Sequence, residues 1–165
     1  MSWKQLLNQP ISAAKSYPGF MYHSEKIFRH EVENLFPKSW YCLGSLSGLQ
    51  TPGDSIVRNI GNQSVIVTRD KKNQLKGFKN TCRHRGATLI EEDGNYPFFS
   101  CPYHRWGFSL EGELKITPSA KHICKEDKNL HPIEIQQFGH LVFGSLEPPG
   151  DINNYLEGCQ QELEN

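Results

Sequence analysis

The chain has 165 residues, with 18 Lys plus Arg against 18 Asp plus Glu. This length suits one domain with its own core. The balanced charge excludes the broad positive field that would attract nucleic acid or an anionic membrane surface. We therefore expect one domain, with no nucleic-acid or membrane partner, whose partners recognise a local patch.

The first 20 residues contain no apolar run of signal-peptide length, and no stretch approaches the roughly 20 apolar residues of a membrane span. Pro10, Pro18 and Gly19 interrupt any periodic pattern. Residues 1–20 are therefore predicted to form an arm with one short helix near residues 3–8. We expect a cytoplasmic protein whose compact part begins at residue 21.

A helix is predicted over residues 24–36. Ser24 is a suitable N-cap and Pro37 a suitable terminator. Apolar side chains fall on one broad helical face, namely Ile27, Phe28, Val32, Leu35 and Phe36.

From residue 39 the pattern changes to short β-branched and aromatic runs separated by turn formers. Strands, mostly joined as hairpins, are predicted within residues 39–46, 54–60, 64–70, 75–81, 96–101, 106–114, 132–138 and 140–147. Asp151 is predicted to cap a last short helix that carries Ile152, Tyr155, Leu156 and Cys159. The predicted fold class is therefore mainly β, with one helix at each side.

Five cysteines are an odd number and too few for a disulfide scaffold, which in a reducing compartment favours metal-binding or free thiols. Cys42, Cys124 and Cys159 are expected to be buried or inert thiols.

The other two cysteines each lie close to a histidine. Cys82-x-His84 is followed, after 16 residues, by Cys101-x-x-His104. Two thiolates and two imidazoles on separate loops suit zinc or an iron-sulfur cluster. A zinc finger pairs Cys with Cys and His with His, whereas here each loop supplies one of each. This interleaving favours a Rieske-type [2Fe-2S] cluster, in which one iron takes two Cys and the other two His; a structural zinc module is the alternative.

The surrounding residues sharpen this hypothesis. CRHRGA (82–87) and CPYHRWGF (101–108) resemble the two cluster loops of ring-hydroxylating Rieske oxygenase large subunits, including Trp106 two places after the second histidine. The segment YHSEKIFRHEVENLFPKSWYCLGSL (22–46) is similar to the entry helix and first strand of the same subunits. The resemblance covers about residues 20–150.

The resemblance implies a Rieske [2Fe-2S] domain over residues 21–150, with three small antiparallel sheets and the cluster at the tip of two hairpin-like loops. Residues 151–165 would form a short C-terminal helix or the start of a linker to a catalytic domain absent from this chain. The implied ligands of both irons are Cys82, His84, Cys101 and His104. Respiratory Rieske proteins carry an extra cysteine in each loop, and here the matching positions hold Ala87 and Tyr103.

The implied function is one-electron transfer from a reductase or ferredoxin to the mononuclear non-haem iron of an oxygenase. In the family that iron belongs to a neighbouring subunit, commonly of a trimer. This chain alone is expected not to turn over. His122, His131 and His140, with Asp127 nearby, are the candidates for a substitute iron site, but Pro132 breaks any helix that would align Asp127 and His131. Each is expected to be an ordinary surface or half-buried histidine. A free-standing ferredoxin-like carrier remains the alternative function.

Formal charges of two ferric ions, two sulfides and two thiolates cancel when the imidazoles are neutral. Adding an electron to such a cluster costs less than for an all-cysteine cluster, so a potential within roughly −150 to +300 mV is expected. Outward edges of His84 and His104 would be the exit for the electron.

Residues beside the ligands are expected to support the site. Leu89, Tyr103, Trp106 and Phe108 are candidates for shielding the cluster from water; simple core packing is the favoured alternative for each of them. Loop geometry is expected to depend on Pro102 and Gly107. For Arg83, Arg85 and Arg105 the alternatives are docking of an acidic donor, contact with a catalytic domain, or local pairing.

Overall fold

The structure is a computed structural model that describes residues 10–118, 120, 122 and 124–159. The helix predicted near residues 3–8 lies outside the described residues. The α-helices are α2 (Glu25–Asn34) and α3 (Ile152–Tyr155), and short 3₁₀ turns lie at Ile11–Ala13, Gly19–Tyr22, Phe36–Lys38, Leu46–Gly48 and Glu126–Lys128. The strands are β1 (Tyr41–Ser45), β2 (Asp54–Ile60), β3 (Gln63–Arg69), β4 (Leu75–Lys79), β5 (Gly94–Asn95), β6 (Phe99–Ser100), β7 (Gly107–Phe108), β8 (Leu114–Ile116), β9 (Pro132–Phe138) and β10 (Leu141–Ser145).

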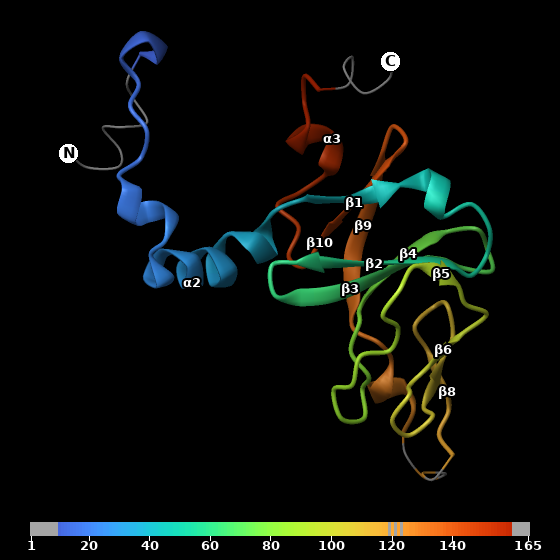
Figure 1. Ribbon diagram of the computed structural model, residues 1–165. Coiled ribbons are helices and arrows are strands. Elements are labelled where there is room, and N and C mark those ends of the chain that lie inside the picture. The colour runs from blue at the N-terminus through green and yellow to red at the C-terminus, as the bar shows by residue number, and fades with distance from the viewer. Residues whose placement is uncertain (1–9, 119, 121, 123, 160–165) are drawn as a thin grey trace.

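The strands pair antiparallel throughout, as predicted. One set runs in the order β1-β10-β9-β4-β3-β2-β5 and the other in the order β6-β7-β8. Only two residue pairs, Gly77↔Ile133 and Phe78↔Pro132, join β4 to β9, so the larger set consists of two small sheets linked at one point. The β6-β7-β8 sheet lies at the end of the molecule opposite α3 (Figure 1).

Local sequence explains the hairpins. Gly61 has φ +56°, a left-handed conformation that glycine adopts without steric cost, and it connects β2 to β3 in register Ile60↔Gln63. Asp70 closes the next turn by accepting hydrogen bonds from the backbone N–H groups of Lys72 and Gln74. In contrast, β1 pairs with distant β10 and not with β2, so the first strand is not part of a hairpin.

Three groups of apolar side chains form the core. The largest lies beneath the two cysteine-histidine loops and includes Phe78, Phe99, Trp106, Phe108 and Leu130. A second lies within the larger sheet system around Val65, Val67 and Val142, and a third packs α3 through Ile152 against Trp40, Phe138 and Phe143. The loops therefore rest on a core that is separate from the one that holds the larger sheets.

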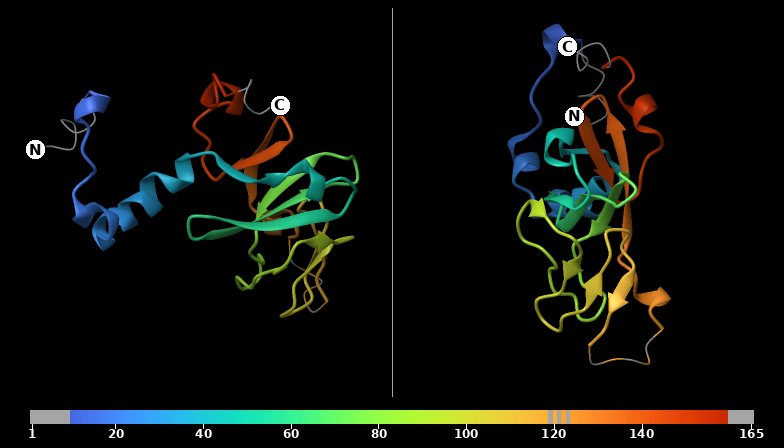
Figure 2. Two further views of the ribbon diagram at one scale, coloured as in Figure 1. Left: turned by 45° about the horizontal axis from the view of Figure 1, so that its top comes forward. Right: turned by 90° about the vertical axis from the view of Figure 1, so that its right-hand side faces the viewer.

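Helix α2 begins where it was predicted, since the Ser24 hydroxyl accepts a hydrogen bond from the Ile27 N–H at 3.4 Å. It ends at Asn34, two residues earlier than predicted, because Phe36–Lys38 tighten into a 3₁₀ turn that contains Pro37. The helix buries none of its residues, and with the preceding arm it projects away from the sheets (Figures 1 and 2). Among the described residues, its apolar face is only partly covered: Ile27 and Val32 are half-buried, and Phe28 is exposed.

At the C-terminal end, Asp151 caps α3 as predicted, by accepting a hydrogen bond from the Asn153 N–H at 2.8 Å. The helix is shorter than expected and ends at Tyr155, before Cys159. Cys42, Cys124 and Cys159 are exposed free thiols. Of the two expected alternatives, buried or inert, only inertness therefore stays a prediction for them. Among the described residues, no helix has the length and apolar character needed to cross a bilayer.

Candidate cluster site

Two loops bring the four predicted ligands to one end of the molecule. Cys82 and His84 lie between β4 and β5, and Cys101 and His104 lie in the tip that joins β6 to β7. Pairing of Ser100 with Gly107 places the second loop at the end of a short hairpin.

The two loops share one turn geometry. In the first, the Cys82 N–H donates to the Ala87 carbonyl at 2.8 Å and the Gly86 N–H donates to the Cys82 carbonyl at 3.0 Å. In the second, the Cys101 N–H donates to the Trp106 carbonyl at 2.8 Å and the Arg105 N–H donates to the Cys101 carbonyl at 3.0 Å. Cys82 thus matches Cys101, and Gly86 matches Arg105.

The matched positions Gly86 and Arg105 both have positive φ, +75° and +58°. Glycine adopts this left-handed conformation freely, whereas a side chain with a Cβ atom adopts it at a cost of about 1 kcal/mol or more. Arg105 is one of two non-glycine residues with positive φ in the described part of the chain, the other being Asn73.

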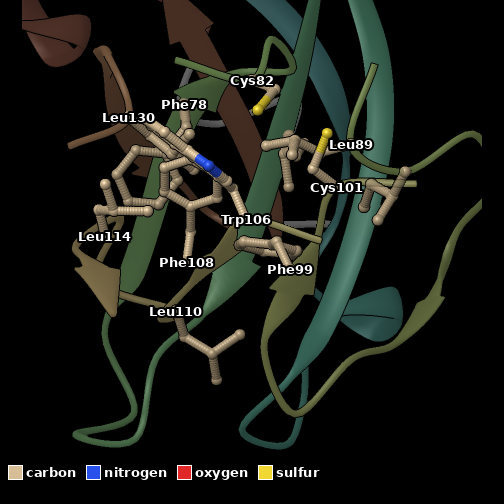
Figure 3. Close-up of a cluster of buried hydrophobic side chains, with 12 residues drawn as sticks. Phe78, Cys82, Leu89, Phe99, Cys101, Trp106, Phe108, Leu110, Leu114 and Leu130 are labelled. Atoms are coloured by element: carbon tan, nitrogen blue, oxygen red, sulfur yellow. The ribbon is translucent and has the colours of Figure 1, made fainter. Parts of the chain in front are cut away.

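The thiols form the inner side of the site. Cys82 and Cys101 are 2% and 1% exposed, both are free, and their sulfur atoms lie at one margin of the apolar cluster (Figure 3). Burial raises the pKa of the Cys82 thiol, and the neighbouring Cys101 raises it further. Hydrogen bonds from the backbone N–H groups of His84 and Arg85 act in the opposite direction and favour the thiolate, the form that binds metals.

The imidazoles form the outer side. The rings of His84 and His104 have centroids 4.6 Å apart and meet at 71°. His84 follows Cys82 by two positions, whereas His104 follows Cys101 by three. The two rings therefore occupy neighbouring positions of the shared turn geometry and not the same position. His84 is exposed, and desolvation, followed by His104 and Arg85, lowers its pKa, which keeps the imidazole in the neutral form that binds metals.

One buried atom bears on which group these residues could hold. Nδ1 of His104 is buried and has no hydrogen-bond partner among the described residues. Buried polar atoms are almost always satisfied, so an orphaned one needs an explanation such as an ion. An imidazole nitrogen of this kind, together with two unpaired buried thiols and a second neutral imidazole, fits the donor set of a mixed Cys/His iron-sulfur cluster.

The expected shielding residues divide into two kinds. Leu89, Trp106 and Phe108 are buried as predicted, and the Trp106 indole is the largest side chain among them (Figure 3). Tyr103 is 62% exposed, so the prediction that it excludes water was wrong for this residue. It lies in the middle of a tight turn, where side chains project outward, and its ring tilts over His104 with centroids 3.8 Å apart.

Gly107 has a different role from the one predicted. It does not form a turn but lies in β7, where a Cβ atom would come within 3.0 Å of the Ile116 Cβ atom. Close packing of β7 against β8, and not a positive φ, requires glycine here. The residues that need left-handed backbone are Gly86 and Arg105.

Asn80 was not singled out from the sequence, yet it closes the first loop. Its side-chain oxygen accepts hydrogen bonds from the N–H groups of Leu89 and Ile90, and its amide donates to the Ile90 carbonyl at 2.7 Å and to the Ser64 hydroxyl at 3.1 Å. The second loop is closed by backbone pairing of β6 with β7. In the first loop, the buried Asn80 side chain takes the place of such strand pairing. The only sequence signal for this role is an Asn that directly follows a strand, two positions before Cys82.

The three arginines of the loops differ in their surroundings. Arg83 is half-buried and anchors the first loop to a distant segment, donating to the Asn129 carbonyl at 3.1 Å, to the Asp127 carbonyl at 3.3 Å and to Nε2 of His131 at 2.5 Å. Arg85 and Arg105 are exposed, and neither side chain makes a hydrogen bond or ion pair with any other described residue. Arg83 therefore pairs locally, whereas the other two do not.

The remaining histidines do not converge on a second site. His131 contacts Arg83, and His122 and His140 are exposed. Within the described ranges no group of three or more His, Cys, Asp or Glu side chains is placed to hold a single metal ion.

Comparison with known proteins identifies relatives that match most of this chain. The chain is 32% identical over 155 residues to a carnitine monooxygenase oxygenase subunit of Acinetobacter baumannii, covering 91% of this chain and 42% of the relative. It is 34% identical over 148 residues to the large oxygenase component of a naphthalene 1,2-dioxygenase system of Pseudomonas putida, covering 81% and 33%. The chain thus spans less than half the length of these relatives.

Solved structures show the same similarity to Rieske oxygenases. A quaternary ammonium Rieske monooxygenase superposes with a TM-score of 0.85 at 31% identity, over 91% of this chain and 42% of that one. Naphthalene 1,2-dioxygenase from Rhodococcus superposes with a TM-score of 0.79 at 35% identity, over 84% and 33%. The family profile of the Rieske [2Fe-2S] domain matches residues 39–138. This chain belongs to the Rieske [2Fe-2S] domain family, whose cofactor is the Rieske-type cluster that its two cysteine-histidine loops predict.

Proposed function

We propose that this chain is the electron-transfer domain of a Rieske oxygenase large subunit. Cys82 and Cys101 would bind one iron of the cluster, and His84 and His104 the other. Once bound, such a cluster accepts and releases one electron at a time. The observation that carries the proposal is the convergence of four donors at one end of the molecule, with thiols buried on the inner side and a close pair of imidazoles on the outer side.

The surroundings of these donors suit that role. The buried apolar side chains around the two cysteines exclude water from the sulfur side, which would lower the local dielectric around a bound cluster. The imidazole side is open, since His84 is exposed. We propose that the outer edges of both imidazoles face the redox partners.

The partners are proposed from the relatives. A reductase or ferredoxin would deliver the electron, and a mononuclear non-haem iron in a catalytic domain would receive it. One similar monooxygenase is described in terms of carnitine oxidation and electron transfer between subunits, and another relative is named for naphthalene. A quaternary amine and an aromatic hydrocarbon have little chemistry in common, so similarity in this domain supports a shared role in electron delivery and not in substrate recognition.

The domain boundaries follow the same proposal. Residues 21–150 would form the Rieske domain, and residues 151–165 would lead toward a catalytic domain. We expect the purified chain, given substrate, dioxygen and reductant, to form no product, because oxygenation needs the catalytic iron. Product formation by the chain alone would contradict this part of the proposal.

Composition of the purified protein tests the ligand assignment. Anaerobic expression should give a brown protein with two irons and two acid-labile sulfides per chain. Its reduced form should give an EPR spectrum distinct from that of an all-cysteine [2Fe-2S] cluster. His104→Cys should shift that spectrum toward the all-cysteine type, whereas His140→Cys should leave it unchanged. A colourless protein with one zinc per chain would refute the assignment.

A further inference from the structure

Each imidazole of the candidate site has an aromatic neighbour, but the two neighbours differ in kind. His84 stacks on the Trp106 indole, with ring centroids 4.6 Å apart and 10° between the planes. His104 is covered by the Tyr103 ring, with centroids 3.8 Å apart and 38° between the planes. Trp106 is 5% exposed, whereas Tyr103 is 62% exposed. One imidazole therefore faces a buried aromatic ring, and the other faces a ring that water reaches.

The second loop positions Trp106 for this contact. The Cys101 N–H donates to the Trp106 carbonyl, and Arg105, directly before Trp106, has φ +58°. This left-handed residue redirects the chain after His104, so the Tyr103 side chain lies in solvent and the Trp106 indole enters the buried cluster beneath the loops (Figure 3). The indole then stacks on the histidine of the other loop.

The face of an indole attracts positive charge. A cation within about 6 Å of an aromatic centroid is stabilised by the negative face of the ring, most strongly by tryptophan and where water is excluded. An imidazole bound to a metal cation takes on part of the positive charge, and that share decreases when the metal is reduced. A buried indole stacked on such an imidazole would therefore stabilise the oxidised form more than the reduced form.

We propose that Trp106 is a positioning residue that acts through His84 to lower the reduction potential of the site. The indole face favours the larger positive charge that His84 carries in the oxidised protein, and burial of Trp106 keeps water from screening this attraction. Tyr103 has a smaller effect through His104, because solvent screens its ring. This inference rests on the proposed electron-transfer function and specifies how the chain regulates it.

Fluorinated tryptophans test the proposal with little change in the shape of the stack. Mono-, di- and trifluorotryptophan, installed at position 106 by stop-codon suppression, withdraw electron density from the indole face in increasing steps. The reduction potential of the cluster-loaded chain, measured by redox titration with EPR detection, should rise with each fluorine. The total change in the redox equilibrium should be roughly threefold to tenfold, where tenfold equals about 59 mV for a one-electron couple.

Trp40 provides the matched control for fluorination. It is also buried, but it packs in a separate cluster, and its indole N–H donates to the Gly150 carbonyl at 3.1 Å. The same fluorinated tryptophans at position 40 should leave the potential unchanged.

Ordinary substitutions give a second series. Trp106→Leu should raise the potential most, and Trp106→Phe less, because it keeps a smaller aromatic face. Tyr103→Leu should shift the potential less than Trp106→Leu does. Phe99→Leu removes another buried ring of the same cluster, one that lies beside Tyr96, and should have no effect. The EPR signal comes only from chains that carry a cluster, so incomplete loading of a variant does not alter its measured potential.

The outcomes distinguish this inference from the function on which it rests. If the wild-type chain holds no iron and sulfide, the electron-transfer function fails and this inference fails with it. If the cluster is intact but fluorine at position 106 leaves the potential unchanged, or fluorine at position 40 shifts it equally, the inference about Trp106 alone is overturned. A shift in Trp106→Leu without any effect of fluorination also overturns it, because the indole then acts by its shape and not by its charge distribution.

Discussion

The imidazole of His84 lies flat against the indole of Trp106, with ring centroids 4.6 Å apart and 10° between their planes. His84 belongs to the first loop and Trp106 to the second, so this stack joins the two halves of the site. The indole also belongs to the buried cluster beneath the loops. One side chain therefore couples the orientation of His84, a proposed ligand, to the packing of the core.

Replacing Trp106 should damage both properties. Trp106→Ala removes a buried indole, which is expected to cost about 3 to 5 kcal/mol of stability, and it frees His84 to change orientation. Trp106→Phe keeps an aromatic face and should lose less of both. Urea midpoints and iron content per chain measure the two effects. If Trp106→Ala binds iron as fully as wild type, the stack is not needed to orient His84.

Gly86 and Arg105, the matched positions of the two loops, lead to opposite predictions for the stability of their variants. Gly86→Ala puts a Cβ atom into open space but at φ +75°, so only backbone strain of about 1 kcal/mol should appear. Arg105→Gly relieves that strain while adding chain entropy to the unfolded state, so stability should be unchanged or rise by up to about 1 kcal/mol. Gly19→Ala, in open space without positive φ, is the control. Thermal midpoints that fell equally in both loop variants would contradict the matched geometry.

The proposed ligand set could be inferred from the sequence because it is local: four residues within 23 positions, each beside its loop turn. Antiparallel strands, the Ser24 cap and the Asp151 cap also follow from short patterns. The errors have two physical origins. One is long-range contact, since the partner of β1 lies 96 to 103 positions away along the chain. The other is local, since Tyr103 lies in a tight turn from which its side chain projects outward.

Arg83 illustrates a role that spacing alone could not assign. Its partners lie 44 to 48 positions away, so the sequence left docking and local pairing equally open. Arg83→Gln should cost about 1 to 2 kcal/mol, since three partly exposed hydrogen bonds are lost. Arg83→Lys should recover little, because an ammonium cannot span the same acceptors. Both variants should lose iron faster on exposure to a chelator, whereas Arg29→Gln should not.

The Arg83 contact should make the first loop sensitive to acid through His131. Desolvation, Arg83 and Lys79 lower the pKa of His131 in the folded chain below its ordinary value of 6.5. The unfolded chain therefore takes up the proton first, so the contribution of His131 to stability is complete above pH 6.5 and decreases as the pH falls below it. Urea midpoints of the cluster-loaded chain should fall between pH 7.5 and 5.5, less steeply in His131→Gln. His140→Gln, in the β9–β10 turn, should follow wild type. If wild type, His131→Gln and His140→Gln all lost stability equally steeply with falling pH, His131 would not be the source of the acid sensitivity.

Asn80 should be the most sensitive polar residue near the site. Asn80→Ala would leave the buried N–H groups of Leu89 and Ile90 without an acceptor, at a cost of about 1 to 3 kcal/mol for each unsatisfied group. Asn80→Asp keeps the acceptor but loses the amide that donates to Ile90 and Ser64, and it places a carboxyl group in a buried position. The aspartate variant should therefore be more stable at acid pH, where the carboxyl is neutral, than at pH 7.5. Ser64→Ala removes one acceptor of the same network and should cost less stability than Asn80→Ala or Asn80→Asp.

Hydrogen exchange of the Leu89 and Ile90 amides, measured by NMR with wild type as reference, reports directly whether the first loop is closed. Unchanged protection of these two amides in Asn80→Ala would show that the side chain does not close the loop.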